Sequence, residues 1–126
     1  MKTVIIVAVL PLLIFALGYW SFTQVRGSAL EVVRSLDALT KEIERGRWEE
    51  AADRSLLLQK VWDKASLIWG PFKDHDEIDA LFEMIARTQY FTAQRQKEEA
   101  LSEAGVARKF AHHIYQSDLP LVGNIL

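Results

Sequence analysis

The chain has 126 residues, enough for one domain, and its 15 Lys and Arg nearly balance its 17 Asp and Glu. Without the N-terminal region that holds Lys2 and Arg26, the remainder keeps all of the acidic residues and is therefore net acidic. Nucleic-acid binding needs a clustered positive field, so we expect no nucleic-acid partner. The absence of cysteine excludes disulfide scaffolds, Cys-ligated zinc and thiol catalysis. The low content of Pro (3) and Gly (6) favours an all-α fold.

An uncharged apolar segment runs from Val4 to Phe22. In a helix it would extend about 28 Å, close to the hydrocarbon thickness of a bilayer. Tyr19 and Trp20 lie near its end, where aromatic rings favour the headgroup region. We therefore predict a transmembrane anchor over residues 1–26 and a bilayer as its partner. The anchoring side chains are expected to include Val4, Ile5, Ile6, Leu10, Leu13, Phe15, Tyr19, Trp20 and Phe22.

A cleaved signal peptide is the competing interpretation of this segment. Lys2 supplies a short basic start, and Ala16-Leu17-Gly18 offers small residues at cleavage spacing. The apolar run continues beyond that point, which favours an uncleaved, single-pass anchor in the cell membrane. Short basic N-termini before a first apolar helix usually stay in the cytoplasm, although Arg26 and further basic residues follow on the other side. We expect the rest of the chain to be extracytoplasmic.

Residues 27–126 form the predicted helical domain, with hairpins at about 28–69 and 74–116 and an apolar tail over 117–126. Apolar residues recur at alternating spacings of three and four, as in amphipathic helices. Gly46 is expected to end the first helix in a left-handed conformation, and Gly70-Pro71 to end the second. The first two rows are Ala29, Val32, Leu36, Leu39 and Ile43, then Trp48, Ala51, Ser55, Leu58, Trp62, Ala65 and Trp69, with Ala52, Leu56, Val61 and Ile68 widening the second.

The third helix is expected to begin at Asp74, whose carboxylate would cap it, with Glu77 placed as in a capping box. A polar turn from Gln94 separates it from a fourth helix at about 97–116. The inward residues are predicted to be Ile78, Leu81, Phe82, Ile85 and Phe91, then Leu101, Ala104, Ala107, Phe110, Ala111 and Ile114. Core burial is favoured for Trp48 and Trp62, whereas for Trp69 core burial and a partly exposed interface role stay equally open.

A short internal repeat supports two similar hairpins. Trp48-Glu-Glu-Ala-Ala and Lys97-Glu-Glu-Ala-Leu lie 49 residues apart, and each opens the second helix of a hairpin. After the N-terminal transmembrane helix, either an antiparallel four-helix bundle or two stacked tetratricopeptide-like hairpins would explain the pattern.

Beside the apolar N-terminal helix, a set of residues distributed over the chain carries a family resemblance: Trp48, Ala51, Trp62, Trp69, Phe72, His75, Glu77, Ile78, Asp79, Asn124, Ile125 and Leu126. With these residues the chain resembles the bacterial family known as domain of unknown function 4363 over nearly its whole length. The resemblance implies a short membrane-anchored helical protein with no established activity and an integral membrane protein as partner. Gly70-Pro71 departs from the family pattern.

Polar residues concentrate in Asp74-His75-Asp76-Glu77 and Asp79. His75 and Asp79 share a helical face and, with His112 or His113, could hold a metal ion. Carboxylates in a first helical turn are explained more simply by capping and by the helix dipole. The two adjacent histidines point about 100° apart and are expected to face different environments. We therefore expect no metal site, no cofactor and no catalytic site.

The function favoured by the sequence is an interaction or accessory module for a membrane partner. The alternatives are a sensor domain that binds a ligand or peptide in a helical groove, a metal-dependent enzyme, and a cleaved, secreted helical protein.

Overall fold

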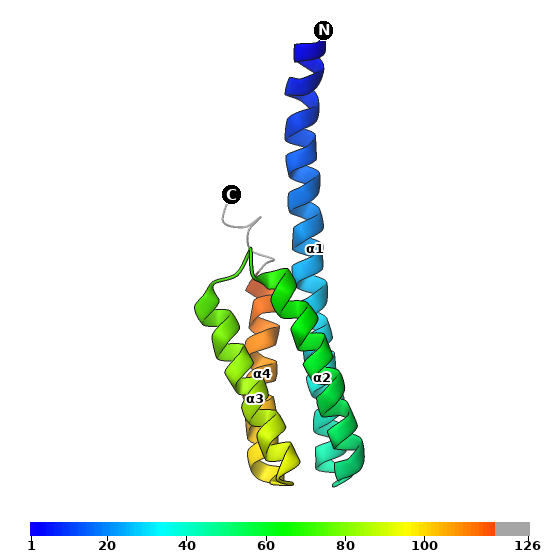
Figure 1. Cartoon of the computed structure of the whole chain (residues 1–126), viewed down its shortest axis with the longest axis vertical. Coiled ribbons are helices and arrows are strands. Elements are labelled where there is room, and N and C mark those ends of the chain that lie inside the picture. Colours follow the sequence, from blue (N-terminus) through cyan, green and yellow to red (C-terminus); the bar gives the residue numbers. More distant parts are fainter. Residues whose placement is uncertain (118–126) are drawn as a thin grey trace.

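The computed structural model describes residues 1–117, which form four helices and no strand. The helices are α1 (Lys2–Glu44), α2 (Trp48–Trp69), α3 (His75–Ala93) and α4 (Lys97–Ser117). Figure 1 shows a bundle of antiparallel helices from which the first half of α1 projects alone. The predicted all-α fold with an apolar N-terminal helix is confirmed. The predicted tail motif of Asn124, Ile125 and Leu126 lies outside the described residues.

Helix α1 joins the predicted anchor and the first helix of the bundle into one element. Its 43 residues correspond to about 65 Å of continuous helix. Residues 1–20 are all exposed, and Val25 is the first buried residue. The helix continues through Gly27 without a break. The side chains change from exposed to buried near this residue, while the backbone stays helical.

The two hairpins are joined mainly through α1 and α4. Helix α1 packs extensively against both α2 and α4, and α4 packs against α3, whereas α2 and α3 make far fewer contacts. The helices thus pack as a bundle with a sparse seam between α2 and α3. Gln89 spans this seam, since its side-chain amide donates to the Gln59 side-chain oxygen at 3.0 Å and to the Ser55 carbonyl at 3.3 Å.

The predicted core is largely confirmed. All five residues of the first apolar row are fully buried, as are Ala51, Leu58, Ala65 and Trp69 of the second. The inward predictions for Ala52, Leu56 and Phe82 are wrong, because Ala52 is exposed and Leu56 and Phe82 are 67% and 54% exposed. Helix α2 buries a narrow face because α1 covers it and α3 scarcely does.

Helix α4 contributes a row of small side chains to the core. Four buried alanines follow the three-four spacing, and Ile114 completes the row towards the end of the helix. Short side chains let helix axes approach closely, which suits a helix that packs against both α1 and α3. The alanines are Ala100, Ala104, Ala107 and Ala111.

The turns of the two hairpins have the same backbone hydrogen bonds, offset by 49 residues. The amides of Gly46 and Arg95 donate to the carbonyls of Ile43 and Thr92 at 3.0 and 3.1 Å. The next amides, of residues 47 and 96, donate to residues 42 and 91, both at 3.0 Å. This pair of bonds is the Schellman motif, with Gly46 (φ 70°) and Arg95 (φ 55°) in the left-handed region. The repeat seen in the sequence is therefore a repeat of turn geometry.

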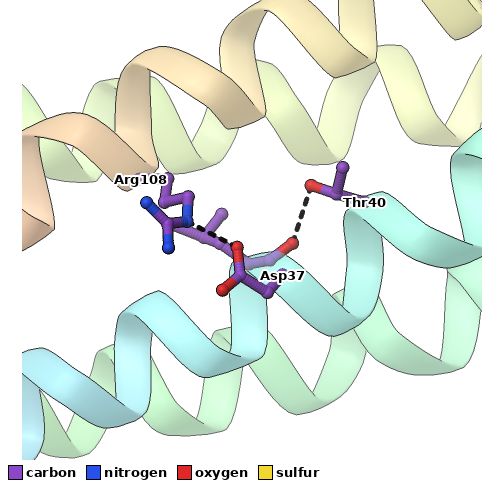
Figure 2. A network of polar contacts seen from close by, with 4 residues as sticks. Asp37, Thr40 and Arg108 are labelled. Carbon is purple, nitrogen blue, oxygen red and sulfur yellow. Dashed lines mark hydrogen bonds and ion pairs between the residues drawn. The ribbon is translucent and has the colours of Figure 1, made fainter.

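An ion pair aligns α1 with α4 on the surface. The Arg108 Nε donates to Asp37 Oδ1 at 2.6 Å, and one turn further the Thr40 hydroxyl donates to the Leu36 carbonyl at 2.8 Å (Figure 2). Both charged side chains are nearly half exposed, so the pair contributes at most about 1 kcal/mol and acts mainly on register.

Candidate functional site at the junction of α1 and the bundle

The acidic cluster at the start of α3 acts as a helix cap. The Asp74 carboxylate accepts the backbone amide of Asp76 at 3.4 Å, which confirms the predicted start of the helix. His75 and Asp79 are exposed, and Glu77 and Ile78 are partly buried. Within residues 1–117, no three His, Asp or Glu side chains are grouped so that they could hold a metal ion.

The adjacent histidines of α4 face different environments, as predicted. His112 is partly buried and lies against Tyr115, with ring centroids 5.9 Å apart, whereas His113 is exposed.

The exposed half of α1 is the most distinctive surface of the described chain. The predicted anchoring side chains from Val4 to Trp20 are all exposed, and Phe22 is partly buried. Among residues 1–117, α1 is the helix long and apolar enough to cross a membrane, a test that a signal sequence also passes. It projects from one end of the bundle, where α2 ends and the α2–α3 connection lies (Figure 1).

Trp69 fastens the end of α2 to α1 directly below the exposed half. Its ring is fully buried, and Nε1 donates to the Ser28 hydroxyl oxygen at 2.8 Å. The Ser28 hydroxyl in turn donates within α1, with the Gln24 carbonyl at 2.8 Å. Trp62 meets the Trp69 ring edge-on at 5.6 Å. Of the two roles left open for Trp69, the structure supports core burial.

Phe72 is an exposed aromatic residue at this end of the bundle. It lies in the connection between α2 and α3 and is 57% exposed. The amides of Phe72 and Lys73 both donate to the Trp69 carbonyl at 2.8 Å, which fixes the connection to the end of α2. A hollow of about 420 Å³ separates this connection from α1 and is lined by Leu17, Gly18, Ser21, Phe22, Val25, Phe72 and Lys73.

Arg26 joins α1 to the end of α4. Its Nη2 donates to the Tyr115 hydroxyl at 2.8 Å, and the guanidinium lies 4.7 Å from the centroid of the same ring. The cation is therefore held against an aromatic face at the base of the exposed segment. Sequence reasoning missed this contact, because the residues are 89 positions apart and no periodic pattern connects them.

Ser28 was also missed, although a signal for it existed. The apolar row that begins at Ala29 extends one turn back to Val25, and Ser28 lies within that extended stripe. A small hydroxyl residue inside an apolar stripe requires a hydrogen-bonding partner, and the Trp69 indole supplies a donor.

These features define a small helical-bundle protein with a candidate membrane-spanning N-terminal helix. The chain matches the family model described as Domain of unknown function (DUF4363) over residues 19–125, and it belongs to this family. The match confirms the resemblance and covers the bundle together with the aromatic end of the apolar segment. Comparison with curated proteins and with solved structures gives no match.

Proposed function

We propose that the protein is a single-pass membrane protein whose first twenty-odd residues cross a bilayer. The exposure of every residue from 1 to 20 carries this proposal. Burial in an apolar medium is worth about 1.5–3 kcal/mol for each large aliphatic or aromatic side chain. The segment contains more than ten such side chains, so lipid stabilises it far more than water does.

Continuity of α1 favours retention of the segment over its removal as a signal peptide. A cut after Gly18 would fall inside the helix and would leave Tyr19 and Trp20, which are 65% and 60% exposed, at a new N-terminus in water. It would also remove Leu17 and Gly18 from the hollow beside Phe72.

The bundle is proposed to lie on the extracytoplasmic side and to serve as an interaction or accessory module for an integral membrane protein. Leu56 and Leu67 support a protein partner, since they are 67% and 80% exposed on α2. Eleven residues correspond to about three helical turns, so the two side chains lie on the same face of the helix. The net acidic charge of residues 27–126 also favours a protein partner over nucleic acid.

Alkaline carbonate extraction tests the anchor. The full-length chain is expected to stay with the membrane pellet, with its intact mass showing that residues 1–18 are retained. Release of full-length protein into the supernatant, or a mature product that begins near Tyr19, contradicts the proposal.

The proposed orientation is testable because the chain has no cysteine. Tyr90 is 61% exposed on the bundle, and Lys2 lies at the other end of α1. In spheroplasts, a membrane-impermeant maleimide is expected to label Tyr90→Cys and to leave Lys2→Cys unlabelled until the membrane is permeabilised. The reverse pattern places the bundle in the cytoplasm.

Site-specific photo-crosslinking tests the partner surface. A benzophenone side chain at Leu56 or Leu67 is expected to form an adduct with a membrane protein, and one at Val106, which is 49% exposed on α4, is the matched control. Adducts at all three positions indicate random collision. The lack of any adduct at Leu56 and Leu67 in the native membrane removes this surface as the interaction site.

A further inference from the structure

The α2–α3 connection lies at the end of the bundle from which α1 projects (Figure 1). Its exposed apolar residues are Pro71 and Phe72. Phe72 shares a hollow with Leu17, Gly18 and Phe22 of α1. Phe72 therefore lies at the level of residues 17–22 of α1, which belong to the segment proposed to cross the bilayer.

The position of this hollow along α1 determines whether lipid or water surrounds it. Tyr19 and Trp20 are the residues expected at the lipid headgroups, where aromatic rings are favoured. The hollow extends from Leu17 to Val25, so it spans the level of these two rings and reaches past them towards the N-terminus. In the proposed arrangement, lipid therefore surrounds the part of the hollow nearest Leu17.

From these positions we propose that the α2–α3 connection is a second membrane contact, in which the Phe72 ring enters the boundary between lipid headgroups and acyl chains beside α1. The inference rests on the proposed membrane anchor and adds a lipid-binding role for residues that the anchor does not include. The occupant of the hollow is lipid of the same bilayer, because the hollow continues directly into the exposed apolar surface of α1.

The chemistry of the connection fits an interfacial contact of limited depth. Phe72 has more than half of its surface available for burial, and Lys73, the next residue, also lines the hollow. The carboxylates of Asp74 and Asp76 follow immediately and are exposed, which keeps the start of α3 out of the hydrocarbon.

The connection is also held in place before any contact with lipid. The Trp69 indole donates a hydrogen bond to the Ser28 hydroxyl oxygen, and the Trp69 carbonyl accepts hydrogen bonds from the amides of both Phe72 and Lys73. Pro71 restricts the backbone further. Little conformational entropy is therefore lost when a connection fixed in this way meets a lipid surface.

Site-directed spin labelling of the full-length protein tests the inference, because a cysteine-free chain gives no background. Three single-cysteine variants are reconstituted in phosphatidylcholine vesicles: Phe72→Cys, Ile14→Cys in the middle of the apolar segment, and Tyr90→Cys on the far part of the bundle. The accessibility of each nitroxide to oxygen, which partitions into lipid, is compared with its accessibility to a water-soluble nickel chelate.

The expected result is that labels at residues 14 and 72 are more accessible to oxygen than to nickel, with the opposite order at residue 90. A water-like label at residue 72, with a lipid-embedded label at residue 14, overturns the inference and leaves the anchor intact. A label at residue 72 shielded from both reagents shows that protein covers the hollow and also overturns it. A water-like label at residue 14 overturns the proposed anchor itself.

Discussion

At the scale of single residues, the two hairpin turns offer a natural comparison. Gly46 and Arg95 occupy equivalent left-handed positions, with φ of 70° and 55°. Glycine adopts this region without steric cost, whereas a side chain with a Cβ meets the following carbonyl at a cost of about 1–2 kcal/mol. The second turn therefore keeps the geometry of the first at the expense of local strain.

We expect Arg95→Gly to raise the free energy of unfolding by about 0.5–1 kcal/mol, since part of the relief is offset by the greater flexibility of glycine in the unfolded chain. Gly46→Ala is the mirror experiment and should lower it by about 1 kcal/mol. A Cβ at Gly46 meets no atom within 4 Å, so its effect is purely conformational. Thermal denaturation followed by circular dichroism measures both, and a lower melting temperature for Arg95→Gly contradicts the interpretation.

The bond between Trp69 and Ser28 provides a second prediction at this scale. Ser28→Ala leaves the buried indole N–H of Trp69 without its acceptor, and an unsatisfied buried donor costs about 1–3 kcal/mol. We expect a loss of this size in chemical denaturation. Ser102→Ala, at an exposed position of α4, should stay within about 0.5 kcal/mol of the native protein.

A double-mutant cycle separates the hydrogen bond from packing. When Trp69 is already Phe, the N–H is gone, so Ser28→Ala should cost less than it does in the native protein. Equal costs in both backgrounds would show that the bond contributes nothing and that Ser28 acts through packing alone.

At the scale of helices, the alanine row of α4 sets how closely α4 approaches its neighbours. Ala107 is fully buried in the middle of this row. We expect Ala107→Leu to destabilise the bundle by about 1–3 kcal/mol or more, because added methylenes in a packed core force side chains and backbone apart. Val106→Leu, one position along and 49% exposed, is the matched control and should change little. Similar melting temperatures for the two variants would mean that the α1–α4 seam is loosely packed.

Periodicity in the sequence located the helices because the covered face of each one repeats every three or four residues. It failed for Leu56 and Phe82, since the flank of a stripe is buried only if a neighbouring helix covers it, and the α2–α3 seam is sparse. It also gave no indication that α1 is continuous, because a glycine such as Gly27 is compatible with both a break and an uninterrupted helix.

At the candidate site, the apolar segment and the place of Phe72 in a connection were visible in the sequence. The contact of Arg26 with Tyr115 depends on how distant helices meet and left no local signature.

At the scale of the whole molecule, α1 belongs to two environments. Residues 1–20 are all exposed, and buried contacts with the bundle begin at Val25. Such a division means that the bundle owes little of its stability to the projecting half. The continuous helix instead transmits the orientation of one part to the other, because a helix has no flexible joint at Gly27.

This division predicts that the fragment 21–126 folds on its own as a water-soluble bundle. Its melting temperature should lie within a few degrees of that of the full-length protein in detergent, since every deleted residue is exposed and none belongs to the buried core. A fragment 29–126 is the matched control. It also lacks Val25 and Ser28, and so loses a buried side chain and the acceptor of the Trp69 indole, at a cost of about 3 kcal/mol or more.

Circular dichroism and analytical ultracentrifugation should find that the longer fragment is soluble and unfolds cooperatively, and that the shorter one is strongly destabilised. If both fragments melt alike, the bundle begins further along α1 than Val25. If both are unfolded, the apolar half of α1 and the bundle form one folding unit, and the projecting helix is a structural part of the fold as well as a proposed anchor.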